Sequence, residues 1–251
     1  MSTNVPVYVG AIAVVGTAGI LGATSAALYR GSQDSGASRK TSTTVAVASA
    51  VFFAIWAVAS SLFAEHGGYH TQFGKQPPWL AIQTVGSIVT LMILTRVPAV
   101  SRALSVKNAV RLLSWPHLFR IEGVSLIIAM LLGHLPALFA IPAGLGDIAI
   151  GIAEPYVTRR IKSGDGRRAA KWFNILGIAD LANAFILGGL TGYGIVHVTP
   201  VHSSLAFFPL ALVPAVGVPL LLVLHVLTLR RLRSPLREPL TFDSRMAIDV
   251  A

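Results

Sequence analysis

The chain has 251 residues, of which 54% are hydrophobic and only 12% are charged, and its formal net charge is +10. Its mean hydropathy is +0.70. About a quarter of the residues of an ordinary soluble domain are charged, so this composition excludes a soluble globular protein and predicts an integral membrane protein. No cysteine is present, which excludes a disulfide framework and a thiolate metal site.

Seven apolar runs of roughly the length that crosses a bilayer as a helix, about 17–25 residues, follow one another along the chain. The runs cover residues 5–29, 43–63, 79–94, 116–133, 137–157, 172–190 and 205–229, and the third is the shortest. We therefore predict an all-α integral membrane protein, a bundle of seven transmembrane helices over residues 1–230. The basic tail that follows, residues 231–251, is expected to be disordered, as unpacked chain ends usually are.

The basic residues predict the orientation of the bundle. Eighteen of the twenty Lys and Arg residues lie at 230–251 and in alternate connections, at 30–42, 96–115 and 158–171. Short cytoplasmic connections are rich in Lys and Arg, so the N-terminus is predicted to lie outside and the C-terminus in the cytoplasm. A signal peptide requires a basic residue before its apolar region, and none precedes the first run. This run is therefore predicted to remain as a helix.

The same distribution indicates the partners that we expect. The predicted location is a bacterial plasma membrane, whose anionic lipid headgroups attract basic connections at the cytoplasmic face. Membrane orientation explains the net charge, so no nucleic-acid partner is expected. In segment 103–115, an apolar stripe that includes Val106 and Val110 lies on a different side from Lys107 and Arg111. This pattern predicts a short helix on the cytoplasmic surface of the membrane.

The fourth, fifth and sixth runs contain carboxylates, which are costly in hydrocarbon and by default mark function. In each run the carboxylates share one helical face with small residues, because the spacings are three and four. The three faces consist of Glu122, Ser125, Ala129 and Gly133; of Gly144, Asp147, Gly151 and Glu154; and of Gly177, Asp180, Ala184 and Gly188. Small residues let helices approach closely, so we expect the three faces to meet inside the bundle.

Arg120 is the one basic residue inside an apolar run. At about 1.5 Å per residue it lies about 6 Å from the cytoplasmic end of its helix, which is the depth expected for Glu154. The predicted ion pair therefore joins Arg120 and Glu154, and Asp147 or Asp180 is expected to pair with a neighbour. Arg120 and Glu122 lie about 200° apart around an α-helix and are not expected to pair with each other.

One arginine does not balance four buried carboxylates. Each uncompensated ion in such an interior costs several kcal/mol, so either some carboxyl groups stay protonated or water or a cation enters. Asp147 lies near the midplane, after Pro142, which kinks its helix, and interrupted helices at this depth are typical of transporter sites. The candidate binding or proton-coupling residues are Asp147, Glu154, Asp180, Glu122, Arg120, Asn174 and Asn183.

These residues are compatible with two non-enzymatic functions. The first is a transporter or channel for a small solute or cation, coupled to protons through the carboxylates. The second is a non-catalytic membrane subunit or receptor, whose polar centre only fixes helix packing. Neither a G-x-S-x-G nor an H-E-x-x-H motif occurs, and the run PAGLGD lacks the Lys-Ser or Lys-Thr of a phosphate-binding loop, so an enzyme is not the first expectation.

Histidines on the predicted outer side suggest a third function. The candidate metal ligands are His66, His70, His134, His197 and His202. Imidazoles suit Zn²⁺ or Cu²⁺, and a metal held there would make the protein a metal-dependent intramembrane enzyme. No other cofactor is predicted. His225, alone near the end of the seventh run, is interpreted as a packing residue.

Overall fold

The structure is a computed structural model that describes residues 5–70, 75–200 and 204–233. Within these ranges every regular element is a helix, as predicted. The α-helices are α1 (Val7–Asp34), α2 (Arg39–Glu65), α3 (Trp79–Leu94), α4 (Pro98–Ala103), α5 (Ala109–Ser114), α6 (Val124–Leu131), α7 (Ala137–Lys162), α8 (Arg167–Gly192) and α9 (Val218–Arg233). Three short segments of other helical geometry are η1 (Trp115–Gly123), η2 (Ser204–Ala206) and η3 (Val213–Gly217).

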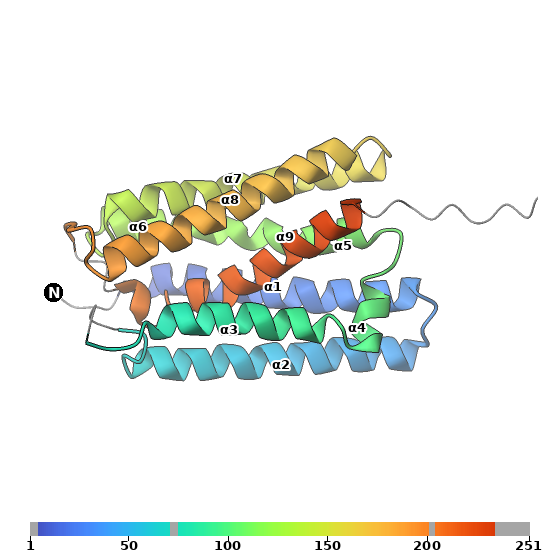
Figure 1. Cartoon of the computed structure of the whole chain (residues 1–251), viewed down its shortest axis with the longest axis horizontal. Helices are drawn as coiled ribbons and strands as arrows, with labels where there is room; N and C mark the ends of the chain where they lie inside the picture. The colour runs from blue at the N-terminus through green and yellow to red at the C-terminus, as the bar shows by residue number, and fades with distance from the viewer. Residues whose placement is uncertain (1–4, 71–74, 201–203, 234–251) are drawn as a thin grey trace, which may run out of the picture.

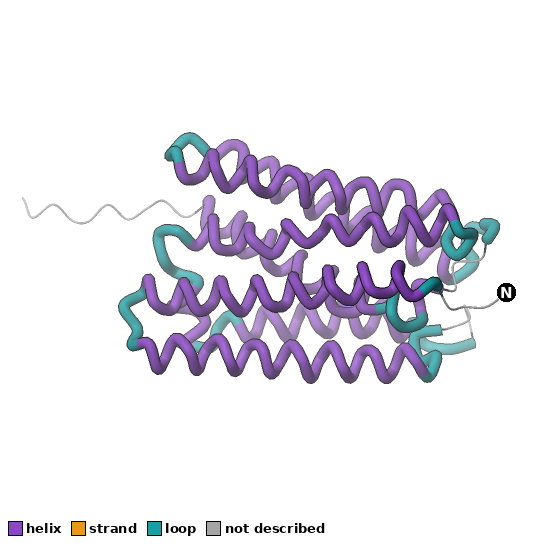
Figure 2. The backbone as a smooth tube through the Cα atoms, turned by 180° about the vertical axis from the view of Figure 1, so that it is seen from behind, coloured by secondary structure: helices purple, strands orange, loops and turns teal. Residues whose placement is uncertain are grey.

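Successive long helices run in opposite directions along the bundle (Figures 1 and 2). One end, here called the N-terminal end, holds the start of α1 and the connections α2–α3, α6–α7 and α8–α9. The opposite end holds α4, the connections α1–α2 and α7–α8, and the last turn of α9. Except for Lys75 and Arg120, every described Lys and Arg lies toward this second end, here called the basic end.

Six helical segments are long and apolar enough to cross a membrane, which supports an integral membrane protein. They are α1, α2, Ala109–Leu131, α7, α8 and Val213–Arg233. In the segment Ala109–Leu131, α5, η1 and α6 follow one another as a single rod. The predicted third span, α3, is an apolar helix of 16 residues, which is about 24 Å long at 1.5 Å per residue.

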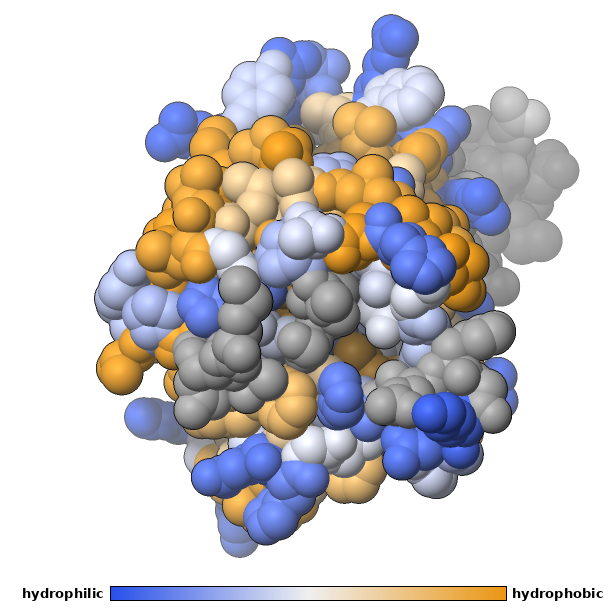
Figure 3. Space-filling model, turned by 90° about the vertical axis from the view of Figure 1, so that its left-hand side faces the viewer, coloured by the Kyte–Doolittle hydropathy of each residue, from blue (hydrophilic) through white to orange (hydrophobic). Residues whose placement is uncertain are grey.

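The outer faces of the bundle are apolar, as contact with lipid requires. On α2, for example, Val51, Ile55, Val58 and Leu62 are more than half exposed and share one face. An exposed apolar surface of this kind is unusual in a soluble monomer and is typical of an interaction surface. Figure 3 looks onto the N-terminal end and shows hydrophobic residues reaching the sides of the molecule between hydrophilic ones.

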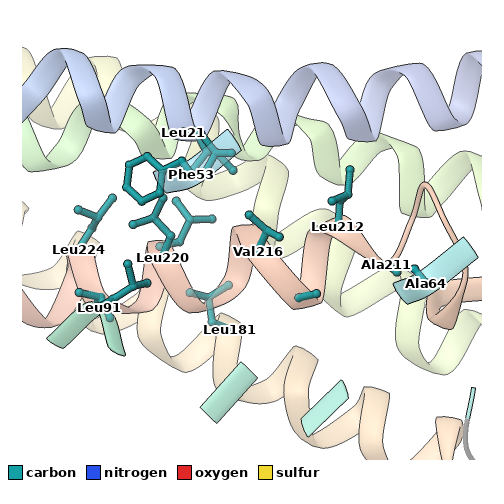
Figure 4. Close-up of a cluster of buried hydrophobic side chains, with 14 of the residues drawn as sticks. Leu21, Phe53, Ala64, Leu91, Leu181, Ala211, Leu212, Val216, Leu220 and Leu224 are labelled. Atoms are coloured by element: carbon teal, nitrogen blue, oxygen red, sulfur yellow. The ribbon is translucent and has the colours of Figure 1, made fainter. Parts of the chain in front are cut away.

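The largest apolar core cluster holds α9 against its neighbours. Leu220 of α9 lies between two sets of side chains (Figure 4). Leu21 of α1 and Phe53 of α2 are on one side, and Leu91 of α3 and Leu181 of α8 are on the other. This cluster therefore fixes the first half of α9 relative to α1, α2, α3 and α8.

The prediction of a surface helix over residues 103–115 is wrong. Helix α4 ends at Ala103, and α5 begins at Ala109 after a turn. In α5, Leu112 and Leu113 are buried, and the helix packs against α1 and α9. Neighbouring helices, rather than lipid headgroups, therefore cover the apolar side of this segment.

Both ends of the last membrane helix differ from the prediction. Its helical part begins at Val213 rather than at residue 205, because short turns precede it. At the other end, α9 continues to Arg233, three residues into the predicted tail. The rest of that tail, residues 234–251, lies outside the described residues.

Prolines shape the start of this helix. Pro219 has no N–H to donate to the preceding turn, which disturbs regular α-helical bonding, and the segment before it, η3, is π-helical. The hydroxyl of Thr84 in α3 donates a hydrogen bond to the carbonyl oxygen of Pro214 at 3.1 Å. Thr84 thus satisfies a carbonyl in the disturbed turn and ties α3 to the start of α9.

Candidate functional site

The candidate site is built on η1, a nine-residue 3₁₀ helix in the middle of the rod Ala109–Leu131. 3₁₀ segments longer than about four residues are uncommon, and within a helix they often mark a functional position. Pro116 lies near its start and cannot donate a backbone hydrogen bond to the last turn of α5. Side chains three residues apart line up on a 3₁₀ helix, so His117, Arg120 and Gly123 share one buried face.

Arg120 connects three other helices to η1. Its Nε donates to Asp147 Oδ1 of α7 at 2.7 Å, and its Nη1 contacts His225 Nε2 of α9 at 3.1 Å. Its Nη2 donates to Asp180 Oδ2 of α8. The side chain of Arg120 is 0% exposed, and those of Asp147 and Asp180 are 10% and 13% exposed. We call these four residues, together with Asn174, the Arg120 centre.

The hydrogen bonds of Asn174 fix the protonation of His225. Asn174 Nδ2 donates to the carbonyl oxygen of Ala170 at 2.7 Å, so Oδ1 is the atom that faces His225 Nδ1, at 2.8 Å. An amide oxygen only accepts, so Nδ1 of His225 carries the proton. Nε2 is then free of a proton and accepts the bond from Arg120. His225 is therefore a neutral hydrogen-bonding member of the centre, and its interpretation as a packing residue is wrong.

His117 is a member of the site that sequence reasoning missed. Its ring stacks on the ring of His225 with centroids 3.8 Å apart and an angle of 21°, and Phe173 packs edge-on against it. The side chain is fully buried, and within the described chain neither ring nitrogen has a hydrogen-bond partner. The sequence signal for His117 is its position three residues before Arg120. This spacing brings the two side chains directly into line only if the segment is a 3₁₀ helix.

Glu122 faces away from the Arg120 centre. Its Oε2 accepts a hydrogen bond from Thr17 of α1 at 3.3 Å. A Cβ on Gly16 would overlap the carboxyl group, so the glycine allows this close approach. The expectation that Glu122 lies on the face shared with α7 and α8 assumed α-helical geometry and is wrong. Instead, Gly123 contacts α7 at Asp147 and Gly144.

The predicted ion pair of Arg120 with Glu154 is also wrong. Glu154 is buried, but its Oε1 accepts a hydrogen bond from Thr158 of the same helix at 2.5 Å. Seven residues separate it from Asp147, which places it about 10 Å nearer the basic end along α7. Arg120 takes Asp147 instead, because η1 directs the guanidinium toward the middle of α7.

The two predicted asparagines differ in position. Asn174 is 1% exposed and belongs to the Arg120 centre. Asn183 lies in the same helix, α8, but its side chain is exposed on the outside of the bundle. The structure therefore brings Arg120, Asp147, Asp180 and Asn174 together and leaves Glu122, Glu154 and Asn183 outside this group.

Two glycines allow the helices to approach at the centre. A Cβ on Gly146 of α7 would overlap the carboxylate of Asp180. A Cβ on Gly177 of α8 would overlap the imidazole of His225. Small residues at such crossings let membrane helices pack closely, and here they bring polar side chains from α8 and α9 within bonding distance of Arg120.

A cavity of about 170 Å³ reaches the centre from the N-terminal end. It lies between α3, α7, α8 and the start of α9, and Asp147 is among the residues that line it. The end of the cavity away from Asp147, here called its mouth, is lined by Tyr69 and His70, which follow α2, and by Tyr193, which follows α8. Burial raises the pKa of the Tyr69 phenol, so this side chain is neutral at physiological pH.

A second hollow lies on the side of the bundle. It is a groove between α2 and α3, lined by Phe52, Trp56, Phe63, Trp79 and the polar side chains Gln83, Ser87 and Thr90. Gly86 of α3 also lines it, at a point where an added Cβ would meet open space. Asp147 does not line this groove, so the groove is separate from the polar centre.

The predicted metal ligands lie near the N-terminal end but do not form a described cluster. His66 Nδ1 contacts the carbonyl oxygen of Leu62 at 2.7 Å, and His70 stacks on Phe207. His134 and His197 lie in the α6–α7 and α8–α9 connections. Over the described ranges, no three His, Asp or Glu side chains gather as they would around a metal ion. His202 lies outside the described residues.

Comparison with models of protein families identifies the family of the chain. Residues 77–233 match the model of a family described as a domain of unknown function, DUF8737. The chain belongs to this family. The matched region begins just before α3 and ends with α9, so it includes the whole Arg120 centre, whereas α1 and α2 precede it. No curated protein and no solved structure matches the chain.

Proposed function

We propose that this member of the DUF8737 family is a membrane carrier for a small solute or cation, and that the Arg120 centre exchanges a proton as the solute moves. The observation that carries this proposal is that the cavity from the N-terminal end reaches Asp147, the same residue whose Oδ1 is bonded to Arg120. A purely structural ion pair needs no access from outside the bundle. A coupling site needs both a solute path and a titratable group at its end.

The charge of the centre supports exchange. Arg120 contributes one positive charge, and Asp147 and Asp180 contribute two negative charges when both are ionised. An uncompensated buried ion costs several kcal/mol, so the remaining negative charge favours uptake of either a proton or a cationic solute. These two occupants compete for one charge, and such competition is the physical basis of coupled transport.

The proposed orientation follows the positive-inside rule. The described basic residues gather at one end, which we propose is cytoplasmic, so the N-terminus and the mouth of the cavity face outward. We also propose that α3 crosses the membrane as a seventh span. Its length of about 24 Å is less than the hydrocarbon thickness of about 30 Å, a mismatch that local thinning of the bilayer can accommodate.

Flux in proteoliposomes tests the carrier. The purified protein is reconstituted with a pH-sensitive dye inside, and sodium, benzyltrimethylammonium or benzenesulfonate is added outside. We expect at least one ion to change the internal pH beyond the response of empty liposomes. Asp147→Asn should abolish the change, because the amide keeps the shape of the carboxyl group but cannot ionise.

Asp165→Asn is the matched control, since it makes the same chemical change at an exposed connection where Asp165 pairs with the exposed Arg160. It should respond as the wild type does. A response that survives in Asp147→Asn would contradict the proposed coupling role. A folded wild-type protein that gives no response to any of the three ions would contradict the carrier.

A second candidate function has an observation in its favour. Each of the three nitrogens of the Arg120 guanidinium has a partner, and His225 and Asn174 extend the same network. A satisfied network can serve helix packing alone, as a non-catalytic membrane subunit or receptor would require. In that case a partner should co-purify in mild detergent, and Asp147→Asn should leave the complex intact.

A further inference from the structure

The chemistry of the cavity walls restricts what can occupy it. Four aromatic side chains from separate parts of the chain line the space: Tyr69, Phe139, Phe185 and Tyr193. Aromatic faces attract cations, and quaternary or primary ammonium groups are recognised in this way. Most of the other lining side chains are aliphatic, so the body of a ligand must be largely apolar.

The inner end of the cavity carries a carboxyl group and, within the described part of the chain, no basic side chain. Among the described residues that line it, Asp147 is the only acidic one, and no Lys or Arg belongs to the lining. Arg120 lies behind Asp147 and is fully buried. Thr84 of α3 also lines the cavity, but its hydroxyl is already bonded to the carbonyl oxygens of Leu80 and Pro214. A ligand therefore meets a carboxylate, and this electrostatic environment favours a positive group over a neutral or negative one.

The volume sets the size of the ligand. An apolar cavity of about 150 Å³ holds one benzene molecule, and this cavity measures about 170 Å³. It therefore has room for one ring, or an alkyl chain of similar bulk, with a short substituent. Larger ligands would need the helices around the mouth to separate.

We propose that the cavity binds a small organic monocation, an amine or quaternary ammonium with one ring or a short apolar chain, whose nitrogen lies beside Asp147. This names the class of solute for the carrier proposed above and rests on that proposal, although binding can be measured without transport. The cation neutralises the excess negative charge of the Arg120 centre, and its apolar body replaces water against the aromatic walls.

Three probes of nearly equal size test the charge preference. Benzylammonium, benzyl alcohol and benzoate are titrated at neutral pH into the purified full-length protein in nanodiscs, with binding followed by calorimetry. The cation is expected to bind at least tenfold more tightly than the alcohol, and benzoate more weakly than both. Binding of the alcohol or of benzoate as tightly as the cation would overturn the proposal.

Two variants locate the site. Asp147→Asn should lose the preference for the cation and keep the affinity for benzyl alcohol. Gly189→Leu should weaken binding of the cation at least tenfold, because Gly189 lines the cavity and a Cβ added there meets open space, so a leucine side chain can occupy part of the volume. Its control is Gly86→Leu, which makes the same change in the groove between α2 and α3 and should bind as the wild type does.

The outcomes separate this proposal from the carrier. If Gly189→Leu binds benzylammonium as well as the wild type, the cation site is not in this cavity and the proposal fails, even if Asp147→Asn does not fold. If the cation binds at the cavity but no ion changes the pH inside proteoliposomes, the carrier fails and the site stands. If sodium or benzenesulfonate gives a pH response and benzylammonium does not bind, the carrier stands and this proposal fails.

Discussion

Nε2 of His225 accepts a hydrogen bond from Nη1 of Arg120 at 3.1 Å, while Nδ1 of the same ring donates to Asn174. The imidazole of α9 therefore connects Asn174 of α8 to Arg120 of the 3₁₀ helix η1 by hydrogen bonds. With Nη1 held in this way, Nε and Nη2 of the planar guanidinium are directed at Asp147 and Asp180. The histidine orients the cation that holds the two carboxylates.

Replacing His225 by Phe tests this arrangement. Phe keeps a ring against His117 and Phe173 but removes both hydrogen bonds, and one of them comes from a charged group. We expect the free energy of unfolding to fall by about 2–4 kcal/mol, measured by denaturation in a mild detergent. His117→Phe, at a ring without described hydrogen bonds, is the comparison and should cost less. Equal losses in the two variants would show that stacking, not hydrogen bonding, is what His225 contributes.

Loss of Arg120 should be more severe. In Arg120→Ala, Asp147 and Asp180 remain buried without their common counter-charge, and breaking such a pair costs about 3–5 kcal/mol. Arg120→Lys should recover only part of this loss, because an ammonium group lacks the rigid fork that reaches several acceptors at once. Thermal unfolding of the purified variants gives the order wild type, Lys, Ala. A native-like melting temperature for Arg120→Ala would mean that the carboxyl groups need no partner.

Close packing at the centre gives a prediction for glycine. Gly146→Ala should destabilise the protein by about 1–3 kcal/mol, as overpacking does, because the added methyl group overlaps the carboxylate of Asp180. Gly22→Ala is the control, since a Cβ on Gly22 of α1 meets open space. Alanine favours a helix over glycine by about 0.5–1 kcal/mol, so Gly22→Ala should be neutral or slightly stabilising. The prediction fails if both variants melt at the same temperature.

The orientation can be tested by cysteine labelling, because the chain has no native cysteine. Gln76 lies just before α3 at the N-terminal end, and Ser163 follows α7 at the basic end; both are exposed. An impermeant thiol reagent should label Gln76→Cys in intact cells and should label Ser163→Cys only after the cells are opened. The reverse pattern would invert the proposed orientation.

Much of the fold could be predicted from hydropathy alone, because the pattern of apolar runs and basic connections depends only on local composition. The all-helical character of the described chain and the gathering of basic residues at one end are examples. The ends of elements were less predictable. The start of the last membrane helix depends on how Pro214 and Pro219 are accommodated, and Thr84, 130 residues away from Pro214, takes part in that accommodation.

The candidate site was predictable in its residue types but not in its pairs. The rarity of charge in hydrocarbon was enough to select Arg120, Asp147 and Asp180. The partner of Arg120 depends on the direction of its side chain, and this direction changes when η1 adopts three residues per turn instead of 3.6. The same change turns Glu122 toward α1 and brings His117 into line with Arg120. A sequence analysis based on α-helical periodicity could not predict the direction of Glu122 or the alignment of His117 with Arg120.

The 3₁₀ geometry of η1 also links rotation to length. Each residue advances about 2.0 Å in a 3₁₀ helix and about 1.5 Å in an α-helix, and it turns about 20° further around the axis. Conversion of all nine residues of η1 into α-helix would therefore shorten the rod by about 4 Å. It would also swing Arg120 around the rod axis, away from Asp147 and Asp180. A single change in η1, from 3₁₀ helix to α-helix, would therefore both separate Arg120 from the two carboxylates and shorten the rod.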